Sequence, residues 1–106
     1  VLRDVPKPAA DIPACLAAHG QDARPCSFSR DFAFTRADAL YGAEKAAAVP
    51  GARFLDLDDL LCPGDPCPVI AADGTIIYRD AHHLTATISR ELGPVLGRRL
   101  SAALRP

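Results

Sequence analysis

The sequence predicts an α/β fold, in which short parallel strands and a β-hairpin are flanked by helices. Residues 32–49 carry apolar side chains at helical spacing, and the strand-like run 53–57 follows them, which is the order found in parallel α/β units. Two apolar runs within 68–78 are joined through Asp73-Gly74, a strong hairpin signal. An amphipathic helix is expected from about 85 to 104.

The first part of the chain is predicted to hold a strand end and a short helix. Residues 1–4 are expected to end a buried strand, because Pro6 then breaks regular structure. A helix is expected over 11–18, with Asp11 as its N-cap and Gly20 as the residue that stops it.

The predicted helix over 32–49 is rich in alanine. Thr35 is its expected N-cap, and Pro50-Gly51 ends it. A narrow apolar stripe would allow it to pack closely on a sheet; the stripe consists of Ala39, Leu40, Ala43, Ala46 and Ala47.

The second half of the chain is predicted to be divided by turns. Residues 58–61 are expected to turn helically, and two prolines and a glycine make 62–67 a tight turn. The hairpin strands are expected at 68–70 and 75–78. The last helix is interrupted by Gly93-Pro94, where a kink can form. Its apolar stripe consists of Ile88, Leu92, Val95, Leu96, Leu100 and Leu104.

The composition is that of a globular protein. The 106 residues are 49 % hydrophobic and 24 % charged, which suits one small domain or a piece of a larger one. A net charge of −1 without runs of like charge argues against nucleic acid or an anionic membrane surface as the partner. No apolar run approaches the roughly 20 residues of a membrane span, and no signal peptide is visible. The start at Val1 indicates a processed chain or a fragment.

Four cysteines leave three pairings open. Disulfides are favoured over free thiols because a small core gains stability from such links. Closeness in the sequence favours the pairs Cys15–Cys26 and Cys62–Cys67. The alternatives are four reduced thiols in the cytosol, or a zinc site, although the spacings lack the tight knuckles of zinc ligands. Disulfides predict an extracytoplasmic compartment.

The segment 78–85 is where an aspartate and two histidines crowd together. Asp80 and His83 are three residues apart, so the carboxylate can fix the imidazole tautomer and raise the basicity of the other ring nitrogen. Such an imidazole can act as the general base for a serine hydroxyl. The spacing alone favours a helix cap with exposed histidines. A metal site made of Asp80, His82, His83 and His19 is the weakest interpretation, because adjacent histidines rarely share one metal.

Other polar residues have simpler interpretations. His19 is expected to be an exposed residue at a helix end, and Arg79 a solvated side chain. Three aspartates that alternate with leucines are interpreted as the polar face of a turn and not as a cation site; they are Asp56, Asp58 and Asp59.

Four segments resemble, in order and spacing, the C-terminal part of the SGNH (GDSL-like) hydrolase domain that is fused to membrane acyltransferase-3 proteins of bacteria. The segments are 13–17, 56–62, 67–70 and 78–87. The resemblance implies that 1–106 is the C-terminal portion of a flavodoxin-like, three-layer SGNH fold. It also implies an O-acyltransferase or esterase that acts on cell-surface glycans.

The resemblance implies roles for two residues. Asp80 and His83 stand at the aspartate and histidine of a Ser-His-Asp triad, and His82 falls at a variable position without a catalytic role. The family's Gly-Asp-Ser block is absent, and none of the serines lies in a nucleophile context; they are Ser27, Ser29, Ser89 and Ser101. The nucleophile-bearing N-terminal part is therefore expected to be missing, and this chain alone is expected to be inactive.

The implied partners follow from that chemistry. They are an acyl donor delivered by a membrane acyltransferase domain, a carbohydrate acceptor and the missing N-terminal part of the domain, with no nucleic acid and no cofactor. The alternative hypothesis is a non-catalytic, disulfide-stapled extracytoplasmic module that binds a glycan or a protein.

Overall fold

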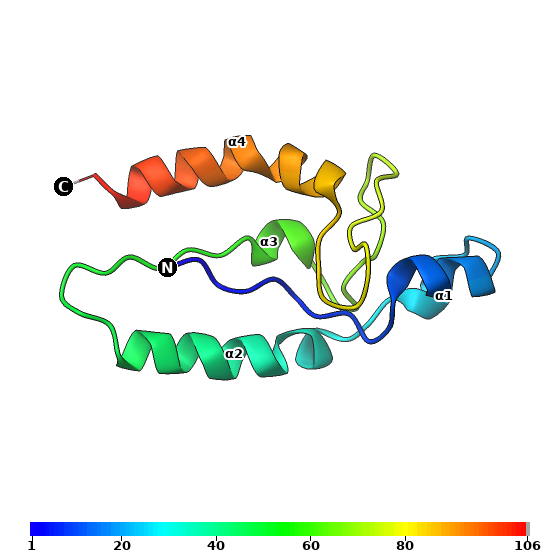
Figure 1. The fold of residues 1–106 in the computed structure, drawn as a ribbon, viewed down its shortest axis with the longest axis horizontal. Coiled ribbons are helices and arrows are strands. Elements are labelled where there is room, and N and C mark those ends of the chain that lie inside the picture. The colour runs from blue at the N-terminus through cyan, green and yellow to red at the C-terminus, as the bar shows by residue number, and fades with distance from the viewer. Residues whose placement is uncertain (106) are drawn as a thin grey trace.

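The computed structural model describes residues 1–105, and its regular structure is helical. The elements are α1 (Ile12–Ala18), the 3-10 helix η1 (Arg24–Cys26), α2 (Arg30–Ala46), α3 (Asp58–Leu61) and α4 (Ala86–Ala103). The two long helices, α2 and α4, lie on opposite sides of two extended segments, the N-terminal one and the one that leads into α3 (Figure 1). The molecule is elongated, with extents of 50 × 27 × 20 Å.

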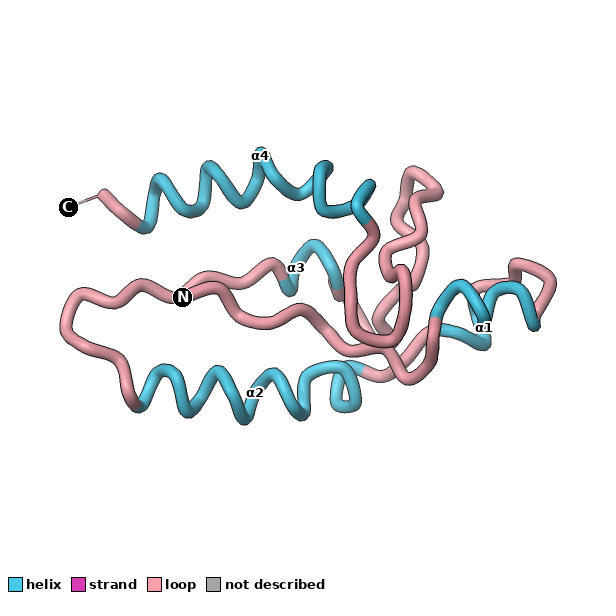
Figure 2. Tube along the Cα trace, viewed as in Figure 1, coloured by secondary structure: helices cyan, strands magenta, loops and turns pink. Residues whose placement is uncertain are grey.

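The predicted α/β fold with parallel strands is wrong for the described residues, which contain no sheet (Figure 2). Segments 1–4 and 53–57 do run side by side in parallel, but they form one isolated bridge between Leu2 and Leu55. Two backbone hydrogen bonds hold it, from Arg3 N to Leu55 O and from Leu55 N to Val1 O. A pair of strands without a third is marginal in water, and within residues 1–105 no third segment joins this pair.

The predicted hairpin is likewise a chain reversal and not a pair of strands. The turn at Asp73-Gly74 forms, but only one bridge, between Ile70 and Ile76, joins its arms. The ladder does not extend further: Ile77 O accepts from Thr85 N and not from the other arm, and the Thr85 hydroxyl donates to Ile76 O. The Asp-Gly pattern specifies the turn, whereas contacts with residues outside the hairpin determine whether its two arms pair as strands.

Helix α1 confirms the prediction for 11–18. The Asp11 carboxylate accepts a hydrogen bond from Ala14 N at 3.0 Å, which caps the first turn. His19 is the C-cap, and Gly20 follows with φ +59°, a left-handed conformation that ends the helix at little steric cost. The buried side chains of this helix are Ile12 and Leu16.

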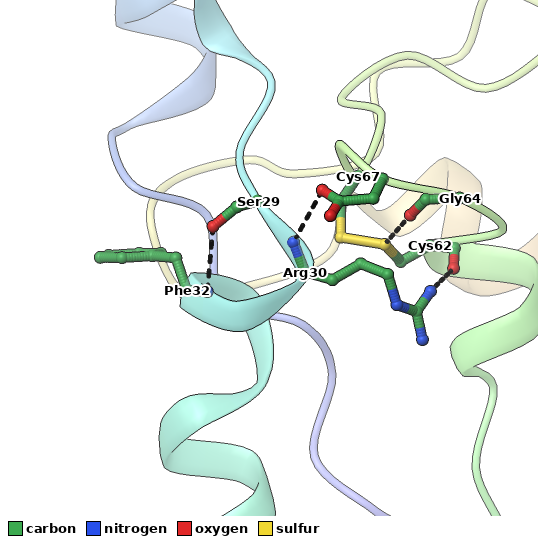
Figure 3. Close-up of a disulfide and its surroundings, with 7 residues drawn as sticks. Ser29, Arg30, Phe32, Cys62, Gly64 and Cys67 are labelled. Atoms are coloured by element: carbon green, nitrogen blue, oxygen red, sulfur yellow. Dashed lines mark hydrogen bonds between the residues drawn. A yellow bond between two sulfur atoms is a disulfide. The ribbon is translucent and has the colours of Figure 1, made fainter.

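Helix α2 begins earlier than predicted. Its N-cap is Ser29, whose hydroxyl accepts from Phe32 N at 3.1 Å (Figure 3). The Asp65 carboxylate of the 62–67 turn accepts from Arg30 N at 3.2 Å. Thr35 is not the cap, because it lies inside the helix and its hydroxyl donates to Asp31 O.

Replacing Ser29 with Ala is therefore expected to lower the free energy of unfolding by about 1 kcal/mol, the usual value of an N-cap. Thr35→Ala is the matched control and should cost less, because the Thr35 hydroxyl bonds within the helix. Thermal unfolding of the two variants measures the difference. A larger loss for Thr35→Ala would contradict this assignment of the cap.

Helix α4 confirms the predicted start at Thr85, whose hydroxyl accepts from Ile88 N. The helix continues through Gly93 and Pro94 to Ala103. Its apolar stripe is covered only in the first half: Ile88 is buried, whereas Leu104 is 69 % exposed.

One hydrophobic core joins α1, α2, α3, the first turns of α4 and the loops, and both predicted disulfides lie in or beside it. Cys15 pairs with Cys26 and Cys62 pairs with Cys67, so the predicted pairing is confirmed. The aromatic and large aliphatic members of this core are Ile12, Leu16, Phe28, Phe34, Leu57, Leu61, Val69, Ile77, Tyr78 and Ile88.

Candidate active site

The segment that carries Asp80 and His83 is a short loop fixed at both ends. Its ends meet in an antiparallel bridge between Tyr78 and Leu84, and Arg79 N donates to His83 O at 2.9 Å. Immediately after the loop, Thr85 begins α4 and bonds back to the chain before Tyr78. The loop is therefore held by backbone contacts that do not depend on the imidazoles.

Tyr78 anchors the loop in the core. Its side chain is fully buried, and its ring packs edge-on against Phe28 with the centroids 5.7 Å apart. Burial raises the pKa of the Tyr78 phenol, so the group stays neutral. A buried aromatic residue directly before an exposed loop fixes the point at which the loop emerges from the core.

Asp80 organises the loop through both carboxylate oxygens. Oδ1 accepts from the backbone N–H of His82 at 2.6 Å and from that of His83 at 2.7 Å. Oδ2 lies 2.9 Å from His83 Nδ1. With Nδ1 bonded to the carboxylate, Nε2 is the nitrogen left for another molecule, and the His83 side chain is 59 % exposed. The side chains thus lie within hydrogen-bond distance, as the D-x-x-H spacing predicts.

The same contacts lower the pKa of the Asp80 carboxyl to about 2 from its ordinary value of 3.8. The largest cause is the hydrogen bond from the backbone of His82, followed by those from the side chain and backbone of His83. Asp80 therefore stays ionised at neutral pH, and its negative charge can stabilise a positive charge on His83.

This pKa shift predicts a pH-dependent contribution of Asp80 to stability. Because the folded-state pKa lies below the ordinary one, the carboxylate stabilises the fold above pH 3.8, and the contribution is lost as the pH falls towards 2. Wild type should therefore unfold at a higher temperature than Asp80→Asn from pH 5 to 7, and the two curves should converge near pH 2. Thermal midpoints measured across this range test it, and a difference that grows in acid would refute it.

His82 faces a different environment from His83. Its side chain is exposed and lines a pocket together with Lys7 and Phe32, which come from distant parts of the sequence. The two imidazole rings are nearly perpendicular, with centroids 6.5 Å apart. Sequence patterns give no indication of Lys7 or Phe32, because only the folding of the chain brings them beside His82.

A family model described as "SGNH domain (fused to AT3 domains)" matches residues 1–98 of this chain, a range that includes Asp80 and His83. The chain belongs to this SGNH domain family. The match supports a domain of the hydrolase or acyltransferase kind. Comparisons with curated proteins and with solved structures gave no match.

No hydrogen bond joins a serine of this SGNH domain to His83 in the part of the chain that the structure describes. Ser27 donates to Arg24 O, and Ser29 caps α2. Ser89 and Ser101 lie exposed on α4. Ser27 and Ser29 therefore serve a turn and a helix cap.

The remaining polar residues singled out by sequence lie apart from the dyad or in ion pairs. His19 is at the end of α1, and no three His, Cys, Asp or Glu side chains within residues 1–105 converge as a metal site, so the metal hypothesis gains no support. Asp58 pairs with Arg3 at 2.7 Å and Asp59 with Arg99 at 2.8 Å. Arg79 is 64 % exposed.

The described helices include none with the length and hydrophobicity of a membrane span. The two disulfides fit an oxidising compartment.

Proposed function

We propose that this SGNH domain supplies the base and the orienting acid of a serine-dependent O-acyltransferase or esterase that acts on cell-surface glycans. The observation that carries the proposal is the 2.9 Å contact between Asp80 Oδ2 and His83 Nδ1, combined with the exposure of the imidazole. Ionised Asp80 then has two tasks, to hold the ring in one tautomer and to stabilise the imidazolium.

In the proposed reaction, His83 Nε2 takes the proton of a serine hydroxyl while the serine oxygen attacks the acyl carbonyl carbon. The tetrahedral intermediate expels the alcohol or thiol of the donor, which takes the proton from His83 and leaves an acyl-serine. A sugar hydroxyl, or water in the esterase reaction, then gives its proton to His83 and attacks the acyl-serine. Protonation of the serine oxygen by His83 restores the starting state.

The serine must come from outside the 106 residues, because none of the serines here stands in a Gly-Asp-Ser block. We propose that residues 1–106 are the C-terminal portion of the domain and that an N-terminal portion carries the nucleophile and the oxyanion hole. The chain alone is then inactive. Fusion to AT3 domains, as the family description states, supports a membrane acyltransferase domain as the source of the acyl group. The disulfides support an extracytoplasmic location.

The second candidate function is a non-catalytic, disulfide-stapled extracytoplasmic module that binds a glycan or a protein. It is favoured by the two disulfides and by the lack of a serine bonded to His83 among the described residues. The sequence that precedes Val1 in the complete polypeptide separates the two candidates, because a Gly-Asp-Ser block there is needed only by the enzyme.

Acyl transfer by a His83→Ala variant of the complete polypeptide tests the proposed enzyme. Loss of transfer supports it, and retained transfer would show that the dyad is not catalytic.

A further inference from the structure

Beside the Asp80–His83 dyad lies a pocket of about 400 Å³ that the proposed acyl-transfer steps do not use. Its volume is within the range of small-molecule sites, roughly 300–1,000 Å³. It is lined by Ala81 and His82 of the dyad loop, by Lys7 of the N-terminal segment and by Phe32 of α2. Since the His82 ring centroid is 6.5 Å from that of His83, a molecule in this pocket lies next to the proposed base.

The apolar part of the pocket centres on Phe32. This residue is in the first turn of α2, and its backbone N–H donates to the Ser29 cap, so its backbone is held in place. Its side chain is 55 % exposed and projects away from the neighbouring disulfide (Figure 3). Together with Pro8 and Ala81 it gives the pocket an apolar lining, and an exposed aromatic face suits the C–H face of a sugar ring.

The charged group of the pocket is already paired within the protein. Lys7 Nζ lies 3.1 and 3.2 Å from the two oxygens of the Asp4 carboxylate and 3.3 Å from His82 O. These three acceptors match the three N–H donors of the ammonium group, and Asp4 neutralises its charge. A pocket whose lysine is neutralised in this way suits a neutral ligand better than a carboxylate or phosphate.

We propose that this pocket is the acceptor subsite and that it holds a neutral pyranose ring. The C–H face of the ring lies on Phe32, and a ring hydroxyl bonds to the imidazole of His82. A second hydroxyl of the same sugar then faces His83. That the ligand is the acceptor rests on the proposed function. That the ligand is neutral and has an apolar face rests on the pocket alone.

Saturation-transfer NMR on the complete polypeptide tests the subsite. The probes are the neutral methyl glycosides of glucose, galactose and N-acetylglucosamine, together with glucuronic acid. We expect transfer from aromatic protons to the ring C–H groups of at least one neutral glycoside. Phe32→Ala should weaken its binding about tenfold, and Phe32→Tyr should keep it, because tyrosine retains the aromatic face.

Leu40→Ala is the matched control, because Leu40 is an exposed apolar residue of the same helix, 52 % exposed, and is not part of the pocket. It should leave binding unchanged. Equal binding by wild type and Phe32→Ala, no binding by any neutral glycoside, or tighter binding of glucuronic acid would each overturn the proposal.

His83→Ala separates this proposal from the proposed function, because it should leave glycoside binding intact while transfer is lost. If transfer is lost in His83→Ala but Phe32→Ala binds normally, the subsite is wrong and the enzyme assignment stands. If His83→Ala still transfers acyl groups, the enzyme assignment fails, and the glycoside titrations still decide the chemistry of the pocket.

Discussion

Replacing His83 with Ala in the complete polypeptide is expected to lower acyl transfer by roughly 10⁴-fold or more, the loss that follows removal of the base from a serine triad. Without the imidazole, the serine hydroxyl has no proton acceptor in reach and remains a weak nucleophile. The rate of acyl transfer to the acceptor, or of hydrolysis of a small activated ester, measures the effect.

The fold should survive this substitution. The His83 side chain is 59 % exposed, and its backbone N–H bond to Asp80 and its carbonyl bond to Arg79 N are kept in the variant. The matched control is His19→Ala, which removes an exposed imidazole at the C-cap of α1, far along the chain from the dyad. Normal activity in His83→Ala would refute the catalytic role, and equal loss in both variants would indicate a general effect of removing histidines.

Asp80→Asn extends this test to the orienting residue. An amide can still accept a hydrogen bond from the backbone of His82, but it no longer stabilises the imidazolium or fixes the tautomer. Transfer should fall by about 10⁴-fold, as for an amide in the place of a triad carboxylate. Small loss in Asp80→Asn with large loss in His83→Ala would mean that His83 acts without this partner.

Contacts between residues close in the sequence were predictable, and contacts between distant residues were not. The caps of α1 and α4 were predictable because Asp11 and Thr85 bond to backbone N–H groups three residues away. The N-cap of α2 was mispredicted, since both Ser29 and Thr35 have the right chemistry and only the chain packing chooses between them. Asp65, which bonds to Arg30 N, lies 35 residues further along the chain.

The strands were mispredicted for a related reason. A β-bridge between Leu2 and Leu55 becomes a sheet only if further segments pair with it, and the apolar pattern of 53–57 carries no information on whether they do. The Asp80–His83 contact could be predicted from a spacing of three residues. The neighbouring pocket could not, because Lys7 and His82 are 75 residues apart in the sequence.

Reduction of both disulfides is expected to lower the free energy of unfolding by about 5 kcal/mol. The chain-entropy relation gives about 3 kcal/mol for the Cys15–Cys26 loop and about 2 kcal/mol for the shorter Cys62–Cys67 loop, whose sequence separations are 11 and 5. A domain of this size has a total stability of roughly 5–15 kcal/mol, so the reduced chain should be largely unfolded or close to it.

The contributions of the two disulfides to the free energy of unfolding should nevertheless differ from the values that loop length alone predicts. Cys62 and Cys67 are both fully buried, and the Cys62 carbonyl accepts from the Arg30 guanidinium, which ties this turn to the start of α2 (Figure 3). Replacing this pair with Ala therefore adds a cavity and loosens the α2 cap, whereas Cys15 is only partly buried. We expect Cys62→Ala/Cys67→Ala to destabilise at least as much as Cys15→Ala/Cys26→Ala.

Thermal unfolding of the two double variants, and of wild type with and without a phosphine reductant, provides the measurement. Because removing either link still leaves the other, each double variant should retain a cooperative transition at a lower temperature, while reduced wild type should lose it. An unchanged thermal midpoint after complete reduction would show that the core stays folded without its disulfides. A smaller loss for the Cys62–Cys67 pair would show that loop length outweighs burial. It would also show that the contacts of Arg30 with Asp65 and with the Cys62 carbonyl of this turn contribute little to the start of α2.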